Sequence, residues 1–333
     1  MDATPTLQAQ LDPDEELLRA VAEAEPENPF HTPAFARARM RRGERAAAFL
    51  AAAAGESRGC TGFVAQGRIH RDLNIVSAPA IDADHPLWGA IEDFCGREGI
   101  TRLRVQTFGS MARGIPSLGN ELFRAPRREF VLALGPECPP LTLSSNHRRN
   151  VRRAERAGIE VHERDDPEAG ETHATLIGAS MSRRRHRGEG VSSETAADPF
   201  HHFLATGAGT VFQARDAQGT VLSSMLVLQS ARGAYYHSAG TSPEGMKSGA
   251  SQLLVATVAE RLRDRGITRF NLGGAGEEQT GLARFKSGFR PETVELEAAT
   301  FDVARGARRT LIGIAEGLRS QAARLRGMRS TGR

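Results

Sequence analysis

The same order of apolar patterns occurs twice along this chain of 333 residues. In the first half, three strand-like segments precede a helical pattern and one more strand, at 46–53, 59–66, 72–78, 86–98 and 101–107. The second half repeats this order at 210–215, 220–228, 234–239, 247–265 and 268–272. Strands that alternate with a helix predict an α/β unit with a mixed sheet flanked by helices. Repetition of the whole unit predicts two copies of one fold in tandem.

The junctions of the two units also correspond. The tetrapeptide GITR stands at 99–102 and again at 266–269. Three prolines within 135–142 favour a linker between the units. We therefore expect an N-terminal domain at 13–138 and a C-terminal domain at 139–302, each with its own sheet, and a site between them at the strand ends near 236–240 and 271–274. We expect the first 12 residues to be disordered, and 303–333 to form an arginine-rich helix, over 303–326, and a tail.

Composition limits the class of protein. Charged residues make up 25% of the chain and hydrophobic residues 39%, as in a soluble globular protein. The longest apolar run, 46–54, is too short to cross a membrane, and the acidic start does not resemble a signal peptide. Three cysteines without CxxC spacing predict neither a disulfide framework nor a zinc site. A cytoplasmic protein is the expectation.

Lysine is rare in this chain. Among 44 basic residues, only Lys247 and Lys286 are lysines, and each is followed by Ser-Gly. A lysine ammonium is compact and can be desolvated, whereas the arginine guanidinium is a planar fork that stays charged. Two lysines kept at glycine-flanked turns predict a need for a point charge there. The alternative is chance survival in an arginine-rich chain.

A predicted helix at 146–157 carries a dense basic patch. Arg149, Arg152 and Arg153 are its candidates for binding a phosphate or another anion. The alternative is an ordinary solvated helix face.

The turn at 240–250 joins a predicted strand to a predicted helix. Such a turn directs backbone N–H groups toward a pyrophosphate at the helix N-terminus. It partly matches the Q/R-x-x-G-x-G/A turn of acetyl-CoA-dependent acetyltransferases, with Met246 and Ser251 at its first and last positions. The candidate donor-binding residues are Lys247, Ser248, Gly249 and Ala250. The alternative is a loop whose small residues allow close helix packing.

The third group of candidates follows the last predicted strand of the repeat. The strand ends in FNLGG at 270–274, and GLARFKSGF follows at 281–289. Lys286 could neutralise an oxyanion formed in acyl transfer or bind a phosphate, from a partly exposed position in a cleft. The other candidate catalytic residues are Phe285, Tyr236 and Asn271. A surface lysine beside a core phenylalanine is the alternative.

The adjacent Tyr235 and Tyr236 must point to opposite faces of one strand, so we expect one in the core and one in the cleft. The sequence shows no Ser-His-Asp set and no Walker loop. The pair His201-His202 has no further ligand nearby, so no metal is predicted.

Three motifs together resemble the FemAB-like acyltransferases of the GNAT superfamily: NHRRNVRRAERAGIEV at 146–161, YYHSAGTSPEGMKSGASQLL at 235–254, and FNLGG with GLARFKSGF. NPFHTPAF at 28–35 is similar to the family's entry segment. The resemblance implies tandem GNAT-like domains with a cleft between them. In the best-known members, the second domain accepts an aminoacyl group from aminoacyl-tRNA. It passes this group to an amine of a peptidoglycan precursor or, in relatives, of a small natural-product scaffold.

The family's Phe-Lys pair maps onto Phe285 and Lys286, where the lysine is associated with the reacting carbonyl or an acceptor phosphate. Asn271 departs from the family, because Asp is frequent at that place in the strand-end motif. The chain also lacks the helical arm of some tRNA-dependent members.

These features lead to three expectations for function. The leading one is N-acyl transfer to an amine, with aminoacyl-tRNA as co-substrate and no bound cofactor. Acyl-CoA is the alternative donor. A non-catalytic protein that binds RNA or a phosphorylated glycan is the alternative of another class. No DNA partner is expected, and the sequence leaves the oligomeric state open.

Overall fold

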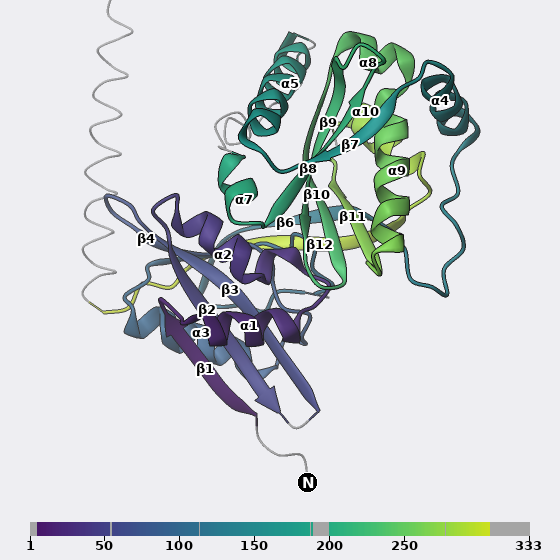
Figure 1. Cartoon of the computed structure of the whole chain (residues 1–333). Coiled ribbons are helices and arrows are strands. Elements are labelled where there is room, and N and C mark those ends of the chain that lie inside the picture. The colour runs from purple at the N-terminus through teal and green to yellow at the C-terminus, as the bar shows by residue number, and fades with distance from the viewer. Residues whose placement is uncertain are drawn as a thin grey trace, which may run out of the picture.

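One mixed sheet of 12 strands runs through the molecule (Figure 1). The computed structural model describes residues 5–306 apart from 54, 113, 187, 189–199 and 277. The strands are β1 Thr6–Leu11, β2 Arg45–Ala53, β3 Glu56–Gln66, β4 Arg71–Ile75, β5 Arg102–Val105, β6 Asn120–Ala133, β7 Glu160–Arg164, β8 Gly209–Arg215, β9 Val221–Gln229, β10 Gly233–Thr241, β11 Arg269–Gly274 and β12 Glu292–Asp302. The helices are α1 Glu15–Ala24, η1 Pro29–His31, α2 Pro33–Met40, α3 Pro86–Arg97, α4 Ser145–Arg156, α5 Pro167–His186, α7 His201–Ala205, α8 Pro243–Ser248, α9 Ala250–Asp264 and α10 Thr280–Ser287.

The strand order is symmetric about the middle of the sheet. It reads β1-β2-β3-β4-β5-β12-β6-β11-β10-β9-β8-β7. From either edge, three antiparallel pairs are followed by one parallel pair, β4 with β5 or β10 with β11. This symmetry confirms the tandem repeat of one mixed α/β unit.

The two units exchange a strand at the centre. β12 follows the second unit in the sequence but pairs with β5 of the first unit, while β6 pairs with β11 of the second unit. β12 pairs with β6 over its whole length. The expectation of two separate sheets is therefore wrong, because this exchange makes one continuous sheet. The exchange also crosses the expected domain boundary at 138.

The structure corrects three further expectations about the elements. Residues 6–11 are not disordered but form β1, because their backbone pairs with β2 along its full length. The helix expected at 247–265 is two helices, since Gly249 adopts a left-handed φ of 84° between α8 and α9. Residues 303–306 are not helical, and the rest of the expected C-terminal helix lies outside the described residues.

Alternating side chains give the sheet two apolar faces. In the C-terminal unit, Phe212, Met225 and Val227 pack with α9, whereas Val211 and Leu226 pack on the face that α5 and α7 cover. The second of these cores continues into the first unit, where α1 and α2 cover it. A third core lies between α3 and β2–β5. No described helix is both long enough and apolar enough to span a membrane.

The two parallel strand pairs differ at their ends. In the C-terminal unit, β10 and β11 pair only as far as Tyr235 and Asn271, although the strands continue to Thr241 and Gly274. The two strands therefore diverge and leave a split in the sheet.

The corresponding place in the N-terminal unit is closed. Beyond the paired segments of β4 and β5, Gln106 N–H donates to the Ile75 carbonyl at 2.8 Å and Ala78 N–H donates to the Gln106 carbonyl at 2.7 Å. Only the C-terminal unit therefore has an open split among these two strand pairs.

Candidate active site

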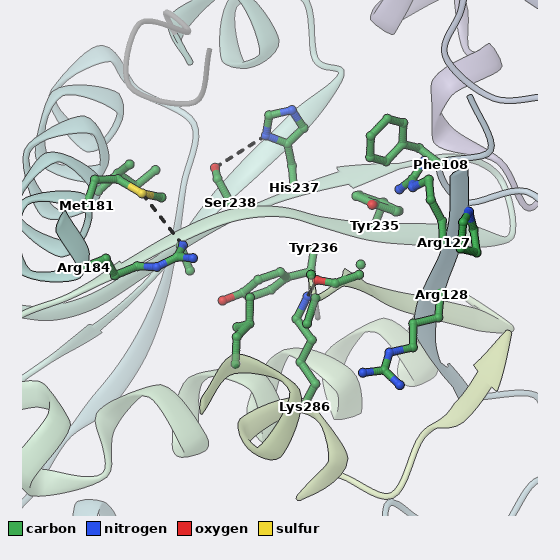
Figure 2. A pocket seen from close by; sticks show the side chains of 18 of the residues that line it. Phe108, Arg127, Arg128, Met181, Arg184, Tyr235, Tyr236, His237, Ser238 and Lys286 are labelled. Atoms are coloured by element: carbon green, nitrogen blue, oxygen red, sulfur yellow. Dashed lines mark hydrogen bonds between the residues drawn. The ribbon is translucent and has the colours of Figure 1, made fainter. Parts of the chain in front are cut away.

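The split between β10 and β11 holds a cavity of about 560 Å³. Helix α5 borders it on one side and β6 on another, with Tyr236 and Lys286 between them (Figure 2). The residues that line it are Phe108, Pro126, Arg127, Arg128, Ile177, Met181, Arg184, Tyr235, Tyr236, His237, Ser238, Ala239, Gly273, Gly274, Ala275, Gly276, Leu282, Lys286 and Glu295. A second cavity of about 270 Å³ shares part of this lining, namely Arg184, Tyr236, Ala239 and Leu282, and extends to the start of α9. The site is thus built mainly by the second unit, with one wall from the exchanged strand β6.

Lys286 lies in the larger cavity and is only 4% exposed. Its Nζ donates a hydrogen bond to the Gly274 carbonyl at 2.6 Å and lies 5.7 Å from the centre of the Tyr236 ring. Burial lowers the pKa of Lys286 to about 7, against the opposing effect of the negative charge on Glu129. The expected partly exposed position is wrong, because α10 holds this side chain under the split. An amine with this pKa exchanges its proton readily near neutral pH.

Glu129 is a fully buried carboxylate beneath the cavity. One oxygen accepts from the Tyr235 hydroxyl at 2.9 Å and from Arg127 at 3.1 Å. The other accepts from Asn271 Nδ2 at 2.7 Å and from the Gly109 N–H at 3.0 Å. Because these donors come from both halves of the chain, Glu129 ties the site to the N-terminal unit.

Asn271 connects Glu129 to the glycine pair at the end of β11. Its Nδ2 donates to Glu129, while its Oδ1 accepts from the Gly273 N–H at 2.7 Å. Gly273 has a φ of 72°, and a Cβ there would lie 3.2 Å from the Tyr235 hydroxyl. An ionised aspartate at 271 could not donate to Glu129, so the amide of Asn271 satisfies this buried carboxylate. Asn271 therefore supports the cavity floor and does not line it.

The other two predicted catalytic residues lie around Lys286. Tyr236 lines both cavities, and burial raises the pKa of its phenol, which keeps it neutral. Phe285 lines the smaller cavity, and its carbonyl accepts from His147 Nε2 at 2.8 Å. Tyr235 is buried, yet its ring also reaches the larger cavity, so both tyrosines contribute to it.

The predicted donor-binding residues lie beside the cavities and not in them. Lys247, Ser248, Gly249 and Ala250 line neither cavity. A Cβ at Gly249 would overlap the backbone of Asn150 on α4, so this glycine permits close helix packing. The lining residues of this segment are Thr241, Met246, Ser251 and Gln252.

The predicted anion-binding helix also lies away from the cavities. α4 packs against α9 and carries Arg149, Arg152 and Arg153 on its outer face. Arg153 donates to the Lys247 carbonyl at 2.9 Å, and Arg149 donates to Asn146 Oδ1 at 3.0 Å. Among the described residues, the larger cavity takes its basic lining from Lys286 and from three other arginines, Arg127, Arg128 and Arg184.

Sequence analysis missed the arginines that line the larger cavity and the buried carboxylate of Glu129 beneath it. Arg127 and Arg128 on β6 and Arg184 on α5 line the larger cavity, with Glu295 as the one carboxylate of its lining. Arg127 also lies 3.8 Å from the centre of the Phe108 ring. A signal was present in the sequence, since Glu129 directly precedes the apolar run FVLAL.

Comparison with known proteins defines the class. Residues 144–287 match the family described as Acetyltransferase (GNAT) domain. The C-terminal unit is therefore a GNAT acyltransferase domain, and the split between β10 and β11 lies within the matched residues. No curated protein matches the sequence significantly.

Solved structures share the fold of this protein over most of the chain. The crystal structure of FemX has a TM-score of 0.67 at 13% identity, covering 88% of this chain and 96% of that one. L-PGS from Bacillus licheniformis gives 0.52 at 15% identity, covering 92% and 97%. The C-terminal domain of a putative lysylphosphatidylglycerol synthetase from Agrobacterium fabrum gives 0.50 at 13% identity, covering 89% and 95%. The chain thus shares the fold of FemX over nearly its whole described length.

Proposed function

We propose that this protein transfers an aminoacyl group from aminoacyl-tRNA to an amine acceptor and forms an amide bond. The observation that carries the proposal is Lys286, buried at the open split beside a cavity of about 560 Å³. An activated ester and an amine held together in such a cavity need orientation and charge stabilisation more than a protein nucleophile.

Lys286 is suited to stabilise the attacked carbonyl. Negative charge develops on the carbonyl oxygen as the amine attacks, and a nearby ammonium lowers the energy of that state most strongly where water is excluded. The bound substrate would also raise the pKa of Lys286 above its value of about 7, because a nearby negative charge favours the ammonium form. The leaving oxygen takes up the proton that the attacking amine loses, and Tyr236, neutral and adjacent, can donate a hydrogen bond to that oxygen as it departs.

The turn before α9 supports a tRNA ester over acyl-CoA. Gly245 N–H donates to Ser242 Oγ at 3.0 Å, and Met246 N–H donates to the Ser242 carbonyl at 3.0 Å. Gly249 N–H donates to the Gly245 carbonyl. Amides that are engaged within α8 cannot bind the diphosphate of coenzyme A. The name lysylphosphatidylglycerol synthetase, carried by a protein of this fold, also describes attachment of an aminoacyl group.

Acyl-CoA remains the second candidate donor because of the smaller cavity. It extends to Ser251 and Gln252 in the first turn of α9, and the N-terminus of a helix favours an anionic group. A pantetheine chain could lie there and reach Tyr236.

A non-catalytic binding protein is disfavoured by the cavity itself. The protein's own side chains do not fill the split, and the buried lysine has no role in binding RNA on an outer surface. The basic lining is instead suited to a substrate that carries an anionic group.

The test is to incubate the protein with tRNA charged with radiolabelled amino acids and, separately, with radiolabelled acetyl-CoA. A mixture of small amines serves as the acceptor. We expect label from aminoacyl-tRNA in an amide product, and little product with Lys286→Met. Transfer of label from acetyl-CoA alone would favour acyl-CoA as the donor. If label is transferred from neither donor, acyl transfer is refuted.

A further inference from the structure

Three side chains connect the interior of the C-terminal unit to the wall of the larger cavity. His173, on α5, is fully buried. Its Nδ1 lies 2.9 Å from Ser224 Oγ on β9, and its Nε2 lies 2.9 Å from Ser238 Oγ on β10. Ser238 lines the cavity, beside His237 (Figure 2), whereas His173 and Ser224 line neither cavity.

Ser224 determines which ring nitrogen of His173 carries the proton. The Ser224 side chain is fully buried, and His173 is its one hydrogen-bond partner within the part of the chain that the structure describes. A buried hydroxyl whose proton meets no acceptor is costly, so Ser224 donates to Nδ1. The ring proton then lies on Nε2, which donates to Ser238 Oγ.

This arrangement leaves the proton of the Ser238 hydroxyl for the cavity. Ser238 Oγ already accepts from His173, so its own O–H is directed away from that ring. The nearby His237 Nδ1 lies 3.5 Å away, at the outer limit of a hydrogen bond. Ser238 is therefore a hydrogen-bond donor toward whatever occupies the cavity.

We infer that the Ser238 hydroxyl donates to an anionic oxygen, a carboxylate or phosphate, of the amine acceptor, and that His173 and Ser224 are positioning residues for it. The inference rests on the proposed function and names the class of its acceptor. Arg184 and Met181, from the same helix as His173, line the same cavity, so a positive charge accompanies this donor. An anionic group beside the reacting amine would thus be favoured over a plain alkylamine.

The same geometry argues against Ser238 as an acyl-carrying nucleophile. A histidine that removes a serine proton becomes an imidazolium and is stabilised by a carboxylate partner. Ser224 occupies that place here. Burial, with repulsion from His237, also lowers the pKa of His173 to about 3, so its ring stays neutral.

The first test needs no substrate. In the full chain, labelled at its histidine ring nitrogens, NMR near neutral pH should show His173 with the proton on Nε2 and none on Nδ1. Ser224→Ala removes the donor to Nδ1, so this variant should shift the His173 signals. The opposite tautomer in the unmodified protein would overturn the inference.

The second test compares two matched acceptors, alanine and ethylamine, with tRNA charged with radiolabelled amino acids. We expect the unmodified protein to prefer alanine in kcat/KM, and Ser238→Ala to reduce this preference roughly 10-fold through KM. His173→Gln keeps an N–H for Ser238 and should retain the preference, whereas His173→Leu should lose it.

The outcomes separate the inference from the function on which it rests. An unchanged preference in Ser238→Ala would refute the role of Ser238 even if transfer occurs. If neither amine is acylated by the unmodified protein, the proposed function fails and the role of Ser238 fails with it. In that case, the His173 tautomer measured by NMR would show only the direction of the hydrogen bonds from Ser224 through His173 to Ser238.

Discussion

Lys286 shows how burial changes the chemistry of a single side chain. A lysine at 4% exposure with one carbonyl partner at 2.6 Å is held more as an amine than as a surface cation. The negative charge of Glu129 raises the pKa of Lys286 only in part, and this carboxylate already accepts four hydrogen bonds from other groups. The residue is therefore poised to gain charge when a negative substrate group arrives.

Replacement of this lysine should separate activity from stability. Lys286→Met should lower turnover by ~10²-fold or more, as does the loss of one oxyanion-type donor. Lys286→Arg keeps the charge but introduces a wider planar fork, so it should recover little activity. Single-turnover rates with aminoacyl-tRNA measure the effect. Full activity of Lys286→Met would show that the lysine has no catalytic role.

The free energy of unfolding should rise with pH in the unmodified protein when it is compared with Lys286→Met. In the folded protein Lys286 loses its proton near pH 7, and in the unfolded chain near 10.5. Between these values the unfolded chain binds more protons, so the free energy of unfolding contributed by Lys286 rises with pH. Relative to Lys286→Met, the unmodified protein should be least stable at and below pH 7 and gain as pH rises to 10.5. Urea unfolding of both proteins across this range tests the sign.

The pH profile of catalysis should have the opposite slope. If the ammonium form is active, kcat/KM should fall as pH rises through about 7, since this parameter reports the free enzyme. The corresponding fall in kcat should occur at higher pH, because a negative group of the bound substrate keeps the proton on Lys286. A rate that instead rises through pH 7 would identify Lys286 as a base.

Glu129 and Asn271 form a hydrogen-bonded pair in which the carboxylate and the amide can be swapped by mutation. Glu129→Gln or Asn271→Asp alone should each destabilise the fold by roughly 2–4 kcal/mol, because donors then face donors or two carboxylates meet. The double variant restores one donor opposite one acceptor and should recover part of the loss. Free energies of unfolding for the four proteins complete the cycle. Strict additivity would mean that the two side chains do not interact.

Among the elements, the regular strands and helices were predictable, and the exchanged strands were not. Short apolar segments between turns correctly indicated β2, β3, β8, β9 and β10; helical spacing indicated α3, and a serine cap with a closing glycine indicated α4. β6 escaped because it contains Pro126 and five charged residues, which argue against a central strand. Its partners β11 and β12 are distant in sequence, so no local pattern could place Glu129 beneath the cavity.

The contact between β10 and α5 sets one wall of the cavity. A Cβ at Gly240 would lie 2.6 Å from the Leu176 carbonyl oxygen on α5, whereas one at Gly178, on the same helix, would meet nothing within 4 Å. Gly240→Ala should displace α5 with Arg184, destabilise the fold by roughly 1–3 kcal/mol and weaken substrate binding. Gly178→Ala is the matched control and should be neutral or slightly stabilising. Thermal unfolding and KM test both, and similar behaviour of the two variants would contradict the close packing.

At the scale of the molecule, strand exchange joins the units into one cooperative body. Trp88, on α3, is the only tryptophan and is buried in the N-terminal unit. Because β12 completes that unit and continues from the C-terminal one, tryptophan fluorescence and far-UV circular dichroism should give one coincident urea transition. Two separated transitions would show that the units unfold independently despite the shared strands.

The long separation in sequence between β5 and its partner β12 has a consequence for synthesis on the ribosome. β5 presents an open hydrogen-bonding edge until β12 has been made and has left the exit tunnel. At roughly 5–20 residues per second, the wait between completion of β6 and completion of β12 is on the order of 10–30 s. The half that is translated first is thus the half that finishes folding last, and the nascent chain must be shielded from other chains throughout that delay.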